Sequence, residues 1–97
     1  MKTFEQLKET LAEHKGELGE KFKVAEIGVF GSYVRREQKR KSDLDVLVSF
    51  SETIDLFMFV ALENYLTDLL GVKVDLVMKD ALKPRLKERI LSEAVYL

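Results

Sequence analysis

Gly31-Ser32, ten further residues, and then Asp43-Leu44-Asp45 form the most informative stretch of this 97-residue chain. Alternate side chains of an extended strand share a face, so Asp43 and Asp45 are expected on the same side. The other side is apolar, because it carries Leu44, Val46, Val48 and Phe50. Two carboxylates about 4 Å apart repel by on the order of 4 kcal/mol at an effective dielectric of about 20. A divalent cation removes that repulsion, and oxygen ligands favour Mg²⁺ or Mn²⁺ over zinc.

The Gly-Ser pair follows a predicted strand over 24–30 and can open a short helix over 32–36. Gly31 lets backbone amides approach a ligand closely, and Ser32 supplies a hydroxyl that can also cap a helix. The start of a helix is a natural phosphate site. Five of the eight residues from 35 to 42 are cationic, and Arg35 is the one nearest to Ser32. A polyphosphate could therefore bind this loop while its metal binds the two aspartates, although the later cations of the loop could equally face water.

Length and composition narrow the classes of protein that fit. A chain of 97 residues is expected to form one domain, 1–97. Its net charge is −1, with 16 basic and 17 acidic residues, so general nucleic-acid binding is not expected. The absence of cysteine excludes disulfides and thiolate metal sites. Because no apolar run approaches ~20 residues and the first residues lack a signal-peptide core, we expect a cytoplasmic protein with no membrane association.

Hydrophobic periodicity predicts an α/β domain of the α+β type, a small mixed sheet with about four helices packed on it. The predicted elements are a helix from a Thr3/Gln6 capping box to about Gly16 or Gly19, strands over 24–30, 43–50 and 72–78, a helix over 55–70 ended by Gly71, and a last helix opened by Pro84 that runs to Leu97. In the third strand Asp75 lies on the face opposite Val74 and Leu76. It therefore has the parity to join Asp43 and Asp45 if the two strands are neighbours.

Some side chains have a structural interpretation as well as a functional one. His14 lies in the apolar seam of the first helix and is expected to pack there, as are Tyr33 and Tyr96. Leu56, Phe57 and Val60 lie off the predicted core stripe of their helix at about 100° per residue. Either other helices cover these three residues, or they form an exposed apolar patch of the kind that marks a protein interface.

At Gly31-Ser32 and Asp43-Leu44-Asp45 the chain resembles the nucleotidyltransferase superfamily that includes DNA polymerase β. The resemblance is to its minimal nucleotidyltransferase (MNT) branch, the small antitoxin partners of HEPN toxins. The family signature is Gly-Ser, about ten residues, and Asp-x-Asp, with a third carboxylate on a later strand that Asp75 matches. The resemblance covers nearly the whole chain. Many relatives have a glycine after the arginine of the Gly-Ser-Tyr segment, and Arg36 is a departure from that pattern in the expected phosphate loop.

The resemblance implies a Mg²⁺-dependent nucleotidyltransferase with Asp43, Asp45 and Asp75 as catalytic residues and as ligands of two Mg²⁺ ions. Asp75, nearest to the acceptor in the family's arrangement, would accept the proton. Gly31, Ser32 and Arg35 would bind the nucleotide. ATP would be the donor and a tyrosine hydroxyl of a partner HEPN toxin the acceptor, which makes the chain a protein adenylyltransferase and an antitoxin.

Two other interpretations stay beside this one. A non-catalytic antitoxin could keep the same fold and neutralise its partner by occlusion alone. A nucleotide-sensing or RNA-contacting module using the loop 35–41 is disfavoured by the net charge of −1. The sequence leaves open the base preference of the site, the identity of the acceptor and whether the chain forms an oligomer with its partner.

Overall fold

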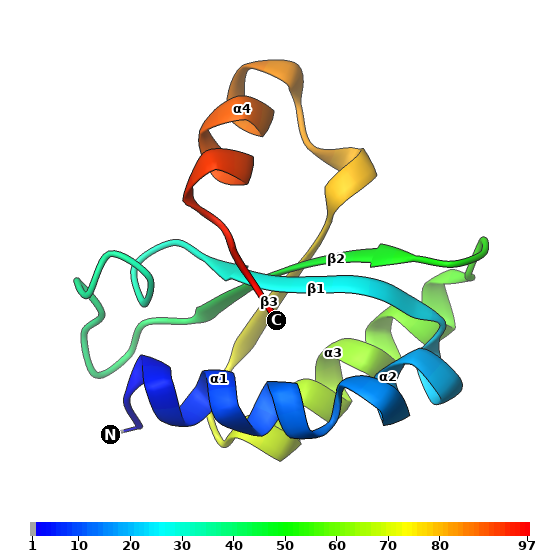
Figure 1. Cartoon of the computed structure of the whole chain (residues 1–97), viewed down its shortest axis with the longest axis horizontal. Helices are drawn as coiled ribbons and strands as arrows, with labels where there is room; N and C mark the ends of the chain where they lie inside the picture. Colours follow the sequence, from blue (N-terminus) through cyan, green and yellow to red (C-terminus); the bar gives the residue numbers. More distant parts are fainter. Residues whose placement is uncertain (1) are drawn as a thin grey trace.

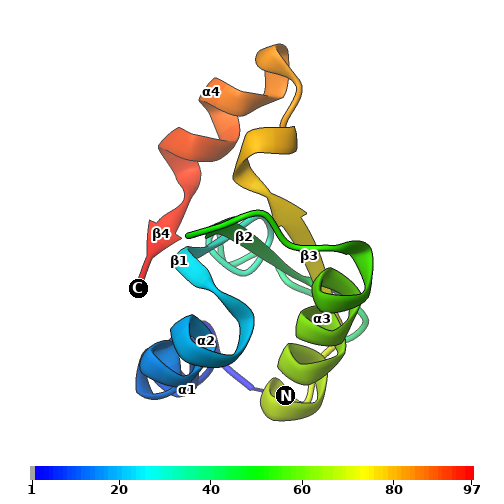
Figure 2. The same cartoon turned by 90° about the vertical axis from the view of Figure 1, so that its right-hand side faces the viewer.

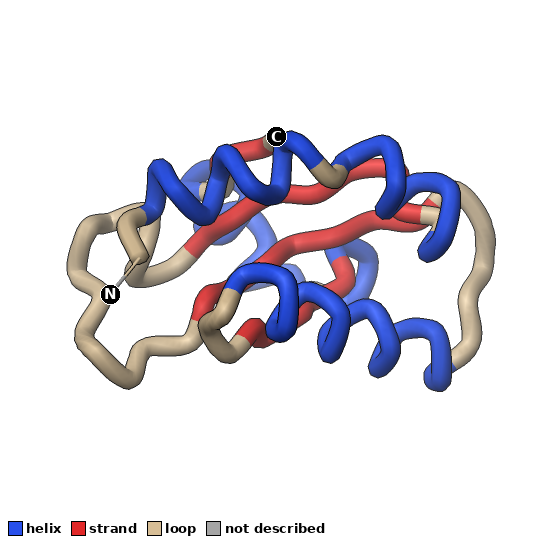
Figure 3. Tube along the Cα trace, turned by 90° about the horizontal axis from the view of Figure 1, so that it is seen from below, coloured by secondary structure: helices blue, strands red, loops and turns tan. Residues whose placement is uncertain are grey.

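A four-stranded sheet with helices on both faces makes up the fold in the computed structural model, which describes residues 2–97 (Figures 1 and 2). Three helices, α1 (Phe4–Glu13), α2 (Lys15–Phe22) and α3 (Leu56–Leu70), cover one face, and α4 (Pro84–Glu93) stands over the other. Seen from below, α3 and the α1–α2 pair lie side by side on the same face of the sheet (Figure 3). Among the described residues no helix is long and apolar enough to cross a membrane. The predicted α+β fold is confirmed.

The strands lie in the order β3-β2-β1-β4 and form a mixed sheet. The strands are β1 (Val24–Phe30), β2 (Leu44–Phe50), β3 (Val74–Met78) and β4 (Val95–Tyr96). β1 is antiparallel to both of its neighbours, whereas β2 and β3 are parallel. A parallel pair needs a long crossover connection, and α3 provides it. The β2-α3-β3 unit therefore brings the starts of β2 and β3 to the same edge of the sheet.

The ends of α3 form where the sequence predicts them. The Asp55 side chain accepts a hydrogen bond from the Met58 N–H at 2.8 Å and caps the helix. Gly71 ends it with φ at +71°, a left-handed conformation that favours glycine. The predicted capping box between Thr3 and Gln6 is also present.

The single long first helix predicted from the sequence is wrong, because the chain breaks at His14 into α1 and α2. His14 lies outside helical geometry at φ −101° and ψ 5°, and Gly16 follows at once and lowers helix propensity. The apolar seam continues across the break, since Leu11 and Leu18 are both fully buried. His14 itself is partly buried, with its ring Nδ1 2.9 Å from the Thr10 carbonyl oxygen, which confirms its packing role.

The core fills the space between the sheet and α1, α2 and α3. Leu44, Val46 and Val48 of β2 are buried in it, as predicted from strand parity. Tyr33 is 1% exposed and belongs to the same core, which confirms that it packs. The aspartates of β2 and β3 therefore belong to the opposite face of the sheet, toward α4.

α4 is the most loosely held helix. It has no buried residue, and its Leu86 is 41% exposed. The predicted continuation of this helix to Leu97 is wrong, because the chain turns extended at Ala94 and returns to the sheet as β4, which pairs with β1 at Gly28 and Val29. α4 is thus attached to the sheet mainly at its ends.

Leu56, Phe57 and Val60 form an exposed apolar surface at the start of α3, here called the α3 patch. Their exposed fractions are 74%, 87% and 44%. Within residues 2–97 no other helix covers them, so of the two interpretations left open by the sequence the exposed patch is confirmed.

Candidate active site

Three aspartates meet where β2 and β3 begin. Asp45 of β2 and Asp75 of β3 are directly paired across the parallel ladder. Asp43 lies immediately before β2, two residues from Asp45. The predicted parity of Asp75 is confirmed, although β3 begins at Val74 and not at position 72. The structure thus places all three carboxylates that the sequence singled out at the same end of β2 and β3, although their side chains are not gathered closely enough to hold one ion.

Burial and the neighbouring carboxylates together shift the pKa of Asp45. Its pKa is raised from 3.8 to about 6, first because the carboxyl is partly buried and then because Asp75 and Asp43 are nearby. Arg35 acts in the opposite direction, and Glu93 adds to the rise. A carboxylate held among like charges in this way binds a cation favourably.

The Gly-Ser turn lies directly against these carboxylates. Gly31 has φ at +83°, and a Cβ added to it would collide with Asp45 Oδ2. Glycine is therefore required at position 31 both by its backbone conformation and by the close approach of the Asp45 side chain. The predicted phosphate loop and the predicted metal ligands form one site.

The donor types suit a divalent metal, because carboxylate oxygens are the ligands that Mg²⁺ prefers in proteins. In the side-chain arrangement of residues 2–97, no three Asp, Glu, His or Cys groups are gathered closely enough to hold an ion. The three aspartates are related by backbone position, because Asp45 pairs with Asp75 across the ladder and Asp43 lies two residues before Asp45.

The short helix predicted to begin at Ser32 is wrong, because residues 32–36 form turns. The Gly31 carbonyl accepts hydrogen bonds from the N–H groups of Val34 and Arg35 at 3.1 and 3.2 Å, as in a first helical turn. Arg36 then has φ at +58°, which ends the turn. Arg36 thus takes the left-handed conformation that suits glycine, at the position where many members of the resembled family carry glycine.

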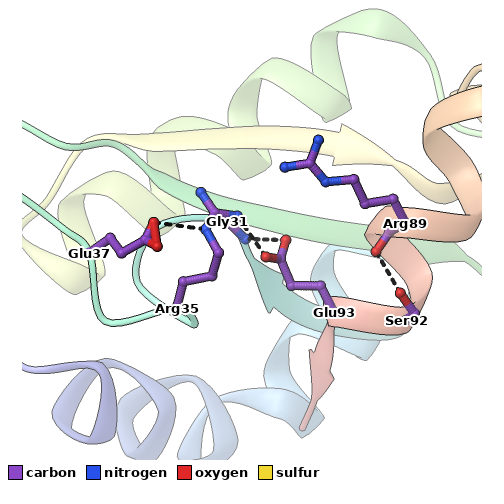
Figure 4. Close-up of polar contacts among 6 residues, drawn as sticks. All are labelled: Gly31, Arg35, Glu37, Arg89, Ser92 and Glu93. Atoms are coloured by element: carbon purple, nitrogen blue, oxygen red, sulfur yellow. Dashed lines mark hydrogen bonds and ion pairs between the residues drawn. The ribbon is translucent and has the colours of Figure 1, made fainter.

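Arg35 is the loop cation that reaches toward the site. Its guanidinium donates to Glu93 at 2.6 Å and to Glu37 at 3.1 Å (Figure 4). The Gly31 N–H also donates to Glu93, at 3.1 Å. Sequence reasoning missed Glu93, because it lies 62 residues from Gly31 and no local pattern connects them. The hydrogen bonds from Arg35 and Gly31 lower the pKa of Glu93 although burial, the largest single influence, opposes them.

The rest of the basic loop borders a separate hollow of about 720 Å³. Its cationic lining residues are Lys2, Arg40, Lys41 and Lys73. The hollow shares Asp43 with the carboxylate group, but Asp45 and Asp75 do not line it. It therefore adjoins the carboxylate group without containing it.

Comparison with known proteins identifies a family, and it is the one that the carboxylates and the Gly31 turn indicate. The sequence pattern of the nucleotidyltransferase domain matches residues 11–97. The protein adenylyltransferase MntA of Thermococcus cleftensis is 53% identical over 97 residues, which cover 100% of this chain and 98% of the relative.

Two solved toxin–antitoxin structures share the fold. One complex, determined with AMP-PNP, contains a chain that superposes with a TM-score of 0.73 at 27% identity, covering 88% of this chain and 69% of the other. A second, a tri-AMPylated Shewanella oneidensis HEPN toxin with its MNT antitoxin, gives a TM-score of 0.68 at 22% identity and covers 93% and 70%. With the carboxylates and the glycine turn in place and these likenesses beside them, the chain belongs to the nucleotidyltransferase domain family, in its branch of MntA-like protein adenylyltransferases.

Proposed function

We propose that this chain transfers AMP from ATP to a tyrosine hydroxyl of a partner HEPN toxin, in a Mg²⁺-dependent reaction that makes it the antitoxin of that partner. The observation that carries the proposal is the direct pairing of Asp45 with Asp75, beside Asp43 and against the Gly31 turn. This arrangement supports nucleotidyl transfer because the reaction depends mainly on positioning and charge neutralisation.

Each part of the site has a role in this proposal. Asp43, Asp45 and Asp75 would hold Mg²⁺, which when bound would supply charge neutralisation for the triphosphate and activation of the acceptor hydroxyl. Gly31 and Ser32 offer the triphosphate backbone and hydroxyl donors, and Arg35 offers its guanidinium.

The proposed step exchanges one bond for another. The hydroxyl oxygen of the toxin bonds to the α-phosphorus of ATP, and the bond from that phosphorus to the bridging oxygen of the β-phosphate breaks. Pyrophosphate leaves, and the hydroxyl proton passes to the Asp75 carboxylate. Asp75 is exposed on the α4 side of the sheet, so an acceptor side chain from another protein can reach it.

Relatives support the choice of substrate and partner. One structural neighbour was determined as a toxin–antitoxin complex with AMP-PNP, and another as an MNT antitoxin with an AMPylated HEPN toxin. For the present chain we assign the toxin contact to the α3 patch, which follows the end of β2 opposite the carboxylates, so that a bound toxin must extend around the domain to bring its hydroxyl to Asp75 (Figure 1). An apolar surface of this kind suits a protein partner better than water.

The function is tested by determining which phosphate of ATP is transferred to the toxin. The chain is incubated with Mg²⁺, its cognate toxin and ATP labelled at either the α- or the γ-phosphate, with the double variant Asp43→Asn/Asp45→Asn as control. We expect the toxin to gain label from α-labelled ATP alone, and none with the control. Label from the γ-position would indicate phosphoryl transfer, and a toxin neutralised without any label would indicate occlusion.

A further inference from the structure

Glu93 occupies two of the donors that the loop offers to a phosphate, the Gly31 N–H and the Arg35 guanidinium. It stands at the last position of α4, and its two carboxylate oxygens accept from different groups: Oε1 from Arg35 Nη1 at 2.6 Å and Oε2 from the Gly31 N–H at 3.1 Å (Figure 4). A backbone amide at a glycine turn and a guanidinium are the donor types that bind phosphate oxygens. The carboxylate of Glu93 therefore makes the contacts that a phosphate would make.

This contact differs from an ordinary surface ion pair. The Glu93 side chain is 18% exposed, whereas that of Glu37, the other partner of Arg35, is 63% exposed. Glu37 also makes no contact with Gly31 among the hydrogen bonds of the described residues. Glu93 in addition contributes to the crowding of negative charge around Asp45, a crowding that an incoming triphosphate would increase.

The middle of the helix that carries Glu93 is not anchored, but its C-terminal end is. α4 buries no residue, whereas β4 pairs with β1 from Val95, two residues after Glu93, so the carboxylate can leave the loop by rotation of its own side chain without movement of β4. Release of Glu93 thus breaks two hydrogen bonds and leaves the core between the sheet and α1–α3 intact.

We propose that Glu93 is a built-in competitor for the phosphate position of the Gly31–Arg35 loop, so that a triphosphate binds by displacing it. The inference rests on the proposed function, in which this loop binds the triphosphate of ATP. Its consequence is that Glu93 lowers the affinity for nucleotide, and that its carboxylate leaves Arg35 and Gly31 when nucleotide binds.

The test measures the affinity of the Mg²⁺ complexes of ATP and of tripolyphosphate for Glu93→Gln, with Glu37→Gln as matched control. Glu37→Gln removes one carboxylate from the same arginine and leaves the Gly31 contact in place. We expect Glu93→Gln to bind both probes about tenfold more tightly, the difference between a charged and a neutral competitor. Glu37→Gln should bind them like the wild type. The Gly31 amide resonance should shift on addition of either probe.

Other results overturn the inference. Equal or weaker binding by Glu93→Gln would mean that Glu93 positions Arg35 for the nucleotide and does not compete with it. Tighter binding of ATP by Glu93→Gln without tighter binding of tripolyphosphate would mean that the substitution acts on the nucleoside and not on the phosphates. Arg35→Ala distinguishes failure of the competition by Glu93 from failure of the proposed phosphate loop. If Arg35→Ala weakens binding while Glu93→Gln does not strengthen it, the loop binds phosphate and Glu93 does not compete. If Arg35→Ala leaves binding unchanged, the loop does not bind the phosphate.

Discussion

Replacing Asp45 by asparagine should make the protein more stable while removing its activity. The folded protein raises the pKa of this carboxyl from 3.8 to about 6, which corresponds to at most about 3 kcal/mol of destabilisation at pH 7. Asp45 is only partly buried, so solvent screening reduces this to about 1 kcal/mol. For a domain of this size, Asp45→Asn should then melt about 4 to 8 °C above the wild type.

The effect of Asp45 on stability depends on pH, because its pKa differs between the unfolded and the folded protein. The unfolded chain loses the Asp45 proton near pH 3.8 and the folded protein near pH 6, so wild-type stability attributable to this group falls as pH rises through that window. The advantage of Asp45→Asn should therefore be small at pH 4, grow up to about pH 6 and stay constant above it.

Thermal unfolding followed by circular dichroism, without metal or nucleotide, measures the effect. Asp68→Asn, which removes an exposed carboxylate of α3, is the matched control and should show no such pH profile. An Asp45→Asn variant no more stable than wild type at pH 7 would refute the account of the carboxylate group. When Mg²⁺ and ATP are added, the wild type should gain melting temperature and Asp43→Asn/Asp45→Asn should not.

Further predictions concern the loop and the α3 patch. Ser32→Ala should weaken ATP binding about ten- to a hundredfold by calorimetry, if its hydroxyl binds phosphate, with an unchanged circular dichroism spectrum; an unchanged affinity would leave Ser32 outside the site. Arg36→Gly should raise the free energy of unfolding by about 1 kcal/mol over Arg36→Ala in urea titrations, because both variants lose the contact with Glu5 but only glycine relieves the positive φ; equal stability of the two would contradict the strain. Phe57→Ser should weaken toxin binding by at least tenfold without changing ATP affinity, and toxin binding equal to wild type would exclude the α3 patch as the interface.

The features that the sequence predicted correctly depend on local periodicity. Strand parity placed Asp75 beside Asp45 because side chains alternate with a period of two. Asp55 and Gly71 fixed the ends of α3 because caps are local chemistry. The position of the three aspartates at one end of the sheet could thus be predicted before the fold was known.

The features that it missed depend on contacts between distant segments or on small conformational choices. The helical spacing of Leu11 and Leu18 continues across the break at His14, so periodicity alone could not reveal two helices. β4 has two residues, too few for a strand pattern. Glu93 meets the loop only because α4 and β4 return to the sheet, an arrangement that no spacing in the sequence encodes.

The intact mass of the cognate toxin tests the central claim most directly. Incubated with ATP, Mg²⁺ and the wild-type chain, the toxin should gain about 329 Da for each AMP transferred, a mass set by the transferred group. Asp75→Asn should still bind the toxin, yet add no mass and leave it active. If the wild type adds no mass with any nucleotide and Asp75→Asn neutralises the toxin fully, the chain works by occlusion and the catalytic account is wrong.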